Sequence, residues 1–338
     1  MKALIQADQI TFTLKNRLFP LKKVFRIAHG ARTEASVLEL SIYDGVHSGW
    51  AEVVPYIRYG ESISSVSEQI KQFFSQNRYA SDLEQQISLL PAGSARNALD
   101  CALWDLKAKQ TRKNVAELLK LPSSEPFITA QTLSIDSAGA MANAIKKITP
   151  APLIKIKLDN KGIIEKIRSI HQASPNSQFI VDANESWSLD DLAQCVDDLK
   201  AMNVILIEQP LPAGKDHDLI TFNSPIPLCA DESCHTSADL TYLKNRYDVV
   251  NIKLDKTGGL TEALNLAQQA EKHGFEIMLG CMVGSSLAMA PIALLAPLAK
   301  YVDLDGPLLI SQDRENGLLF DQGYMSIPAH FLWGNGSK

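Results

Sequence analysis

The sequence predicts an α/β protein, a (β/α)8-type barrel that carries an N-terminal α+β capping domain. From residue 127 onward, a short apolar strand followed by an amphipathic helix recurs at a fairly regular interval, which specifies parallel strands. The chain has 338 residues, enough for a barrel of about 250 residues and a smaller domain. A doubly wound open sheet fits the same alternation, but the chain has no Gly-x-Gly-x-x-Gly turn for a dinucleotide.

The capping domain is assigned to residues 1–122. Turn residues separate apolar segments that predict a small antiparallel sheet, with strands at 10–14, 37–43 and 49–54. Apolar residues at helical spacing then predict helices at 64–74, 94–110 and 115–121. Two polar-aromatic segments, 25–32 and 56–61, are predicted to be loops of the kind that often covers a site.

The polar segment 123–126 follows Pro122 and is the predicted domain boundary. The barrel domain is assigned to residues 127–320, and residues 321–338 are expected to pack back on the capping domain. Eight barrel strands are predicted, at 128–135, 153–158, 178–184, 205–210, 227–233, 249–254, 276–281 and 301–306.

Composition indicates an ordinary globular protein, with 46% hydrophobic and 21% charged residues. The net charge is −5 without a basic stripe, so we expect neither nucleic acid nor a membrane surface as a partner. Five scattered cysteines without a Cys-x-x-Cys pair are typical of free thiols in the cytoplasm. The longest apolar stretch, 287–299, is shorter than the ~20 residues that span a bilayer. The sequence does not determine the oligomeric state, and a homo-oligomer is among the states left open.

The strand at 153–158 is the most informative, because period-two alternation puts Lys155 and Lys157 on one face. Burial and like-charge repulsion both disfavour protonated ammonium groups, so at least one of these lysines is expected to be partly neutral near pH 7. Taken alone, the strand is more simply a polar edge strand with two solvated lysines. The other strand ends reverse that preference.

Carboxylates follow three consecutive predicted strands: Asp182, Glu208 and Asp231. Catalytic groups of parallel barrels lie at the C-terminal ends of the strands, so these three carboxylates should converge. One acidic residue at a strand end is usually a helix cap or an ion-pair partner, but three in succession favour a metal site. Oxygen ligands without histidine or cysteine suit Mg²⁺, and one ion is expected in the site.

Strands two and six of an eight-stranded barrel lie opposite each other, so Lys157 and Lys253 are expected to face each other across the metal. A carbon acid bound between them could lose a proton to one lysine and regain a proton from the other on the opposite face. That exchange inverts a stereocentre.

With these motifs the chain resembles the enolase superfamily and, within it, the muconate-lactonising subgroup, over nearly its whole length. The resemblance implies an enolase-like modified barrel. It also implies roles for six residues: Asp182, Glu208 and Asp231 as Mg²⁺ ligands, Lys157 and Lys253 as the acid–base pair, and Lys155 as a supporting lysine.

Asp303 and Asp305 resemble the Asp-x-Asp motif by which dipeptide epimerases of the L-Ala-D/L-Glu type hold the α-ammonium of a dipeptide. The resemblance thus implies an enzyme that inverts the α-carbon of the C-terminal residue of a dipeptide. The simpler alternative is that either aspartate caps a helix or pairs with a lysine. Further residues assigned to the substrate site are Lys155, Met282, Asn184, Glu232, Arg26, Arg32 and Ser285.

Two other functions stay open at this point. A lyase resembling o-succinylbenzoate synthase, or a cycloisomerase, would use the same lysines and carboxylates. Its substrate, however, has no ammonium to pair with Asp303 and Asp305. A barrel that only binds a metabolite would be expected had a lysine or ligand been lost, and each is present. The preferred dipeptide side chains, and the loop arginine that contacts them, are left open.

Overall fold

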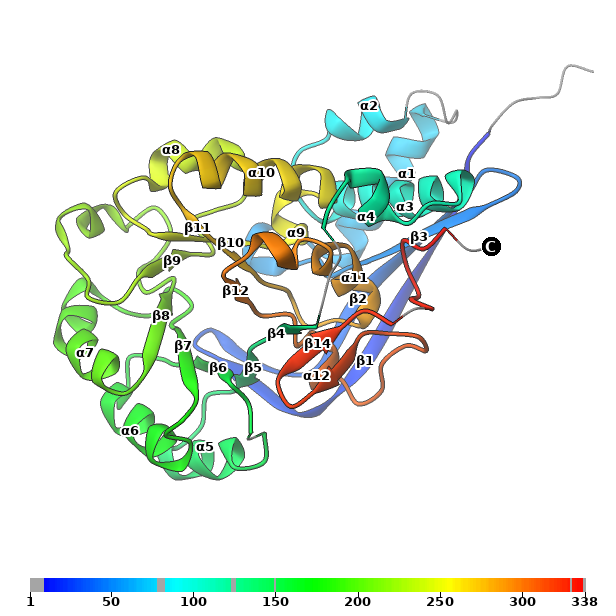
Figure 1. Cartoon of the computed structure of the whole chain (residues 1–338). Helices are drawn as coiled ribbons and strands as arrows, with labels where there is room; N and C mark the ends of the chain where they lie inside the picture. The colour runs from blue at the N-terminus through cyan, green and yellow to red at the C-terminus, as the bar shows by residue number, and fades with distance from the viewer. Residues whose placement is uncertain (1–8, 78–82, 123–125, 149, 329, 337–338) are drawn as a thin grey trace, which may run out of the picture.

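The computed structural model describes the chain except for residues 1–8, 78–82, 123–125, 149, 329 and 337–338. The predicted boundary segment 123–126 therefore lies, apart from Pro126, outside the described residues. Figure 1 shows a barrel of strands and surrounding helices with a second domain, coloured blue to blue-green, packed against it. In the described part of the chain, no helix combines the length and apolarity needed to cross a membrane.

The central sheet has eight strands that lie in the order in which they follow along the chain, all paired in parallel. A backbone hydrogen bond of 2.8 Å from Ala130 N to Val302 O joins its two ends. The predicted barrel architecture is confirmed. The strands are β5 (Gln131–Leu133), β6 (Leu153–Lys157), β7 (Gln178–Asp182), β8 (Val204–Glu208), β9 (Leu228–Ala230), β10 (Val249–Ile252), β11 (Glu276–Leu279) and β12 (Tyr301–Val302).

An apolar layer closes the barrel at the N-terminal ends of its strands. Each strand, or the residue directly before it, contributes one buried side chain: Ala130, Leu153, Ile180, Leu206, Cys229, Val249, Met278 and Tyr301. Side chains of a strand alternate between its faces, so residues two or four positions further on return to the interior. Those positions hold Thr132, Lys155, Lys157, Asp182, Glu208, Asp231, Asn251, Lys253, Asp303 and Asp305. The same periodicity thus places an ionic layer directly above the apolar one.

Helices cover the outside of the barrel. On α6, the buried Ile163, Ile167 and Ile170 recur at helical spacing and face the sheet. Only short helices follow strands β8 and β12. The elements are α5 (Ala138–Ile145), α6 (Ile163–Ala173), α7 (Leu189–Ala201), η3 (His217–Thr221), η4 (Ser237–Asp239), α8 (Leu240–Leu243), α9 (Leu254–Thr257), α10 (Leu260–Lys272), α11 (Ser286–Ala293), η5 (Ala296–Leu298) and α12 (Gly306–Leu309).

The capping domain is an antiparallel sheet, β1-β2-β3, packed against helices. The prediction of a loop at 25–32 was wrong, because these residues form the end of one long hairpin. Pro20 is tolerated there since β1 is an edge strand, and the register shifts between Pro20 and Phe25. The elements are β1 (Thr11–Ile27), β2 (Gly30–Tyr43), β3 (Ser48–Val53), η1 (Ile57–Tyr59), α1 (Ile63–Gln76), α2 (Leu83–Ser88), α3 (Ser94–Thr111) and α4 (Val115–Leu119).

The tip of the β1–β2 hairpin is fastened to the barrel through its main chain. Arg26 N donates to Ser134 Oγ at 2.6 Å, and Ile135 N donates to Arg26 O at 3.1 Å. Nearer the base of the tip, Ser311 N donates to Pro20 O at 2.7 Å. The hairpin therefore extends over the C-terminal ends of the strands, where Figure 1 shows it reaching the green part of the barrel.

The last elements form a second small sheet. Strands β13 (Leu319–Asp321) and β14 (Tyr324–Ser326) pair with β4 (Phe127–Ile128). The first predicted barrel strand, 128–135, was therefore too long, because its start pairs with β14 instead. Further on, two indole groups join the C-terminal segment to β3: Trp50 Nε1 donates to Leu332 O and Trp333 Nε1 donates to Trp50 O, each at 3.0 Å. The exact domain boundaries remain a prediction.

Asp255 of α9 is a buried contact between the two domains. Its Oδ1 accepts hydrogen bonds from Val54 N at 3.2 Å, Asn97 Nδ2 at 3.0 Å and Ser94 Oγ at 3.3 Å. Burial raises the pKa of this carboxyl to about 7, against the effect of its hydrogen bonds. The stability of the packing between the two domains should therefore depend on the protonation state of Asp255.

We expect Asp255→Ala to lower the free energy of unfolding by about 1–3 kcal/mol, because three donors lose their acceptor. Asp255→Asn keeps that oxygen and should cost less. The folded-state pKa lies above the unfolded value of about 4, so the wild type takes up a proton on folding between these values. Its stability relative to the Asn variant should therefore fall as pH rises from about 4 to about 7. Denaturant unfolding across this range measures both effects, and a pH-independent difference would contradict the assignment.

Candidate active site

A cavity of about 240 Å³ opens at the C-terminal ends of the strands, between the barrel and the capping domain. The hairpin tip and the segment at 56–59 form its outer wall. It brings together these predicted site residues: Arg32, Lys155, Lys157, Asn184, Asp231, Glu232, Lys253, Met282, Asp303 and Asp305. Four predicted site residues do not line it: Asp182 and Glu208, which are fully buried, and Arg26 and Ser285. Arg26 bonds to Ser134 through its main chain, and Ser285 caps α11 and donates to Glu52 Oε2 at 2.6 Å.

The three predicted metal ligands lie at the ends of neighbouring strands. Lys157, Asp182 and Glu208 are register partners across β6, β7 and β8, and Asp231 directly follows β9. All three carboxylates are buried. Parallel register therefore explains why residues separated by more than twenty positions converge.

In the described structure, lysines contact these carboxylates. Lys155 Nζ lies 2.9 Å from Asp182 Oδ2 and 2.7 Å from Glu208 Oε2. Lys157 Nζ lies 2.5 Å from Asp182 Oδ2, and Lys253 Nζ lies 2.6 Å from Asp231 Oδ2. The described residues thus do not form a preassembled cage of three metal ligands.

The charge balance of the site nevertheless fits a divalent cation. Six buried carboxylates share the ionic layer with four buried lysines, so the fully ionised layer has two more negative than positive charges. The carboxylates are Asp182, Glu208, Asp231, Glu232, Asp303 and Asp305, and the lysines are Lys155, Lys157, Lys253 and Lys256. A buried excess of this size favours binding of a cation.

Unpartnered oxygens point to the same conclusion. Among the described residues, Glu208 Oε2, Asn184 Oδ1, Glu232 Oε2 and Asn251 Oδ1 are buried without a hydrogen-bond partner. Glu208 Oε2 does form an ion pair with Lys155 Nζ at 2.7 Å, so its charge is compensated even though it accepts no hydrogen bond. Buried polar atoms normally have partners, and oxygen donors are those that Mg²⁺ prefers. The residues present therefore fit the predicted ion.

The expectation of a partly neutral lysine on β6 is not met at Lys155. Burial lowers the pKa of Lys155, but Asp182, Asp303 and Glu208 raise it well above its ordinary value. The pKa of Lys253 is likewise raised against burial, chiefly by Asp231. The sequence-based reasoning considered burial and like-charge repulsion and omitted the carboxylates of adjoining strands, which outweigh both.

Lys157 ends β6 and Lys253 directly follows β10. Both line the cavity, and three strands, β7, β8 and β9, lie between β6 and β10. Space for Lys253 depends on Gly280 at the end of β11. A Cβ added there would come within 2.9 Å of Lys253 Cε and even closer to the side chain of Asn251. A larger residue would therefore displace one of the proposed bases.

Asp303 and Asp305 are held by the first two strands of the barrel. Lys155 Nζ donates to Asp303 Oδ2 at 2.8 Å. Thr132 donates to Asp305 twice, from N to Oδ2 at 2.5 Å and from Oγ1 to Oδ1 at 3.1 Å. Burial, and then the charge of Asp303, raise the pKa of Asp305 to about 7. Asp305 is thus the member of the pair that lacks an ion-pair partner among the described residues.

The segment at 56–61 is fastened at both ends. Arg58 donates to both oxygens of Glu185 at 2.8 Å, and Glu61 accepts from Ser94 N at 2.7 Å at the start of α3. Between them Tyr59 packs edge-on against His235, with ring centroids 4.8 Å apart. These contacts hold the capping domain over the cavity.

Sequence reasoning missed Thr132, Asn251 and Lys256. Thr132 follows Ala130 by two positions, so the alternation along the first strand could have found it. Asn251 Nδ2 donates to Glu208 Oε1 at 2.8 Å, which fixes a predicted metal ligand. Lys256 lies three positions after Lys253, the spacing of one helical turn.

Two family models match the chain. The mandelate racemase / muconate lactonizing enzyme N-terminal domain matches residues 9–120, and the model described as enolase C-terminal domain-like matches residues 140–334. N-acetyl-D-glutamate racemase from a Pseudoalteromonas species is 58% identical over 87% of this chain and 93% of that protein. L-Ala-D/L-Glu epimerase from Escherichia coli K12 is 45% identical over 91% of this chain and 97% of that protein.

Solved structures agree over almost the whole length. An enolase family member from Agrobacterium tumefaciens with homology to dipeptide epimerases, with bound sodium and L-Ala-L-Glu, has a TM-score of 0.91 at 41% identity and covers 96% of this chain and 100% of its own. A dipeptide epimerase from Cytophaga hutchinsonii, complexed with Mg and D-Ala-L-Val, has a TM-score of 0.89 at 25% identity, covering 96% and 94%. Sequence, fold and relatives agree, and the protein is an isomerase of the mandelate racemase / muconate lactonizing enzyme family in the enolase superfamily.

Proposed function

We propose that the protein is a dipeptide epimerase that inverts the α-carbon of a C-terminal glutamate. The observation that carries the proposal is the pair of lysines, Lys157 and Lys253, whose side chains line one cavity from well-separated strands. Inversion by proton transfer requires two such groups on opposite faces of one carbon, a neutral amine that removes the proton and an ammonium that returns one. The names of the Pseudoalteromonas and E. coli relatives support glutamate as the residue inverted.

In this mechanism one lysine, in its neutral form, removes the α-proton, and the other returns a proton to the opposite face. Asp182, Glu208 and Asp231 would hold Mg²⁺, and the Cytophaga structure with Mg supports this ion. When bound, Mg²⁺ would stabilise the negative charge that develops on the substrate as the proton leaves. The capping domain lines one side of the cavity and would reduce access of water, which would strengthen the electrostatic interactions inside it.

Two further groups would position the substrate. Asp305 lacks an ion-pair partner among the described residues and is proposed to bind, with Asp303, the α-ammonium of the dipeptide. Arg32 lines the cavity, and its guanidinium lies 4.9 Å from the ring centroid of Tyr56. Arg32 has no carboxylate within ion-pair distance among the described residues, so the glutamate side chain would supply its counter-ion.

A second candidate substrate is N-acetylglutamate, which has no ammonium. The 58% identity to N-acetyl-D-glutamate racemase favours it, and so does the contact that already pairs Asp303 with Lys155. A pKa of about 7 at Asp305 also allows a neutral carboxyl that could donate a hydrogen bond to an acyl oxygen. Comparison of kcat/KM for L-Ala-L-Glu and N-acetyl-L-glutamate tests the two candidates directly.

The proposed mechanism predicts that activity depends on a divalent metal ion. Glu208→Gln should lower kcat by about a hundredfold or more, because a charged ligand of the proposed ion is lost. Glu276→Gln is the matched control. Glu276 is the first residue of β11, at the end of the barrel away from the site, and forms an exposed ion pair with Lys300. Activity should also vanish on dialysis against EDTA and return with Mg²⁺. Undiminished activity in EDTA would exclude the metal-assisted mechanism.

The two-base arrangement predicts complementary hydrogen exchange in D₂O. Lys157→Ala and Lys253→Ala should each abolish net inversion, because each variant retains only one base. Each should still exchange the α-hydrogen of the one epimer that its remaining lysine faces. Mass spectrometry of both epimers, with Lys300→Ala as control, measures this. Labelling of the same epimer by both variants would leave only one lysine as a base.

Asp305→Asn separates the two substrate classes. Loss of a charge-assisted hydrogen bond of ~1.5–3 kcal/mol should lower kcat/KM for L-Ala-L-Glu by roughly ten- to a hundredfold. N-acetyl-L-glutamate has no ammonium, so its kcat/KM should change little or rise. An equal loss for both substrates would refute ammonium binding by Asp305, and a wild type that turns over only N-acetyl-L-glutamate would establish the second candidate.

A further inference from the structure

Lys256 is the most completely buried charged group of the site that the proposed mechanism does not use. It belongs to α9, its side chain is 0% exposed, and it does not line the cavity. Its Nζ donates to Asp231 O at 2.5 Å, to Asp231 Oδ1 at 2.7 Å and to Asn251 O at 2.9 Å. All three donors of the ammonium are thus used, two of them on one residue.

Lys256 bonds to the main chain at the point where the pairing of β9 with β10 stops. Strands β9 and β10 pair in register at Cys229 with Val249 and at Ala230 with Val250, and the pairing stops there. The next partners in the same register would be Asp231 and Asn251. Lys256 Nζ bonds to the carbonyl oxygens of both. Its ammonium therefore takes the place of the missing backbone bonds at the residue that is proposed to bind the metal.

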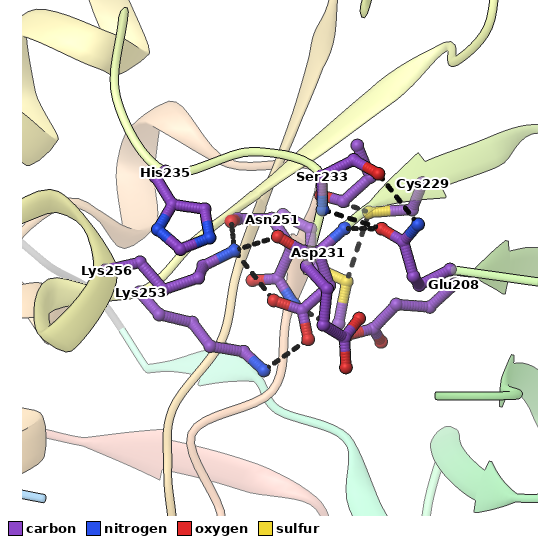
Figure 2. Close-up of polar contacts among 12 residues, drawn as sticks. Glu208, Cys229, Asp231, Ser233, His235, Asn251, Lys253 and Lys256 are labelled. Carbon is purple, nitrogen blue, oxygen red and sulfur yellow. Dashed lines mark hydrogen bonds and ion pairs between the residues drawn. The ribbon is translucent and has the colours of Figure 1, made fainter. Parts of the chain in front are cut away.

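The carboxylate of Asp231 is divided between two lysines. Oδ1 faces Lys256, and Oδ2 faces Lys253 at the cavity, 2.6 Å from its Nζ. Figure 2 shows the two ammonium groups reaching Asp231 separately, Lys256 through several dashed contacts and Lys253 through one. On the main chain, Asp231 N donates to Gln209 Oε1 at 2.8 Å. Oδ2 is thus the oxygen of Asp231 on the cavity side, where it contacts Lys253.

We propose that Lys256 is a positioning residue that fixes Asp231 so that its outer oxygen is presented to the metal ion. A buried lysine is costly unless it is paired, and its interactions here are concentrated on Asp231 and its neighbouring strand. The proposal rests on the metal site of the proposed function. Positioning by Lys256 should strengthen Mg²⁺ binding. Its positive charge alone should weaken Mg²⁺ binding, because a cation beside a metal ligand repels Mg²⁺.

The test is the affinity of the full-length protein for Mg²⁺, measured by calorimetry, in Lys256→Met. If positioning dominates, the dissociation constant should rise by about ten- to a hundredfold, as is typical when a residue that supports a metal ligand is lost. If Lys256 acted only through its charge, removal of the cation should tighten binding. Lys300→Met is the matched control, because Lys300 forms an exposed ion pair and should leave the affinity unchanged.

A second readout separates positioning from general stability. A purely structural lysine would destabilise the metal-free and Mg²⁺-loaded proteins equally, whereas a positioning lysine should reduce the rise in Tm that Mg²⁺ produces. Should Lys256→Met not fold, Lys256→Arg retains the charge with a different donor geometry and should also bind Mg²⁺ more weakly. Unchanged or tighter binding in a folded variant overturns the proposal, whereas a wild type that does not bind Mg²⁺ refutes the metal site itself.

Discussion

The electrostatic balance of one buried layer governs this molecule. Six carboxylates and four lysines lie at the C-terminal ends of the barrel strands, where isolated charges would be too costly to bury. Eight of these ten groups are therefore paired by short contacts. Asp182, for example, contacts both Lys155 and Lys157, and Asp231 contacts both Lys253 and Lys256. The excess of negative charge in this layer favours a cation, and the cover supplied by the capping domain keeps these interactions strong.

The apolar layer beneath makes this arrangement rigid. One side chain from each strand closes the barrel, and the same period-two alternation that buries these residues aims the charged ones upward. Polar contacts then hold individual charged side chains of the ionic layer in place. Thr132 holds Asp305, Asn251 holds Glu208, and Lys256 holds Asp231. Such support matters because catalysis by positioned groups is sensitive to small displacements.

Periodicity explains how much the sequence could predict. Apolar runs with polar residues at their ends were enough to predict the eight strands and to place three carboxylates and two lysines at the C-terminal ends of these strands. Contacts between side chains of different strands could not be predicted. No local pattern reveals that Lys155 contacts Asp303 or that the carboxylates of adjoining strands raise the pKa of Lys155. The hairpin was mistaken for a loop because Pro20 and the register shift beyond it conceal the alternation of an edge strand.

The way in which the hairpin tip is fastened has a consequence for how such an enzyme can diverge. Arg26 contributes its amide and carbonyl to these bonds, and Pro20 its carbonyl. Main-chain groups are the same for almost every amino acid, whereas the side chains of Phe25, Ile27 and Arg32 face the cavity. Substitutions at the tip can therefore alter what the cavity accepts while the cover stays in place. Because different atoms determine closure and selectivity, a mutation can change one without the other. Descendants of one gene can therefore acquire new substrates while the site stays closed.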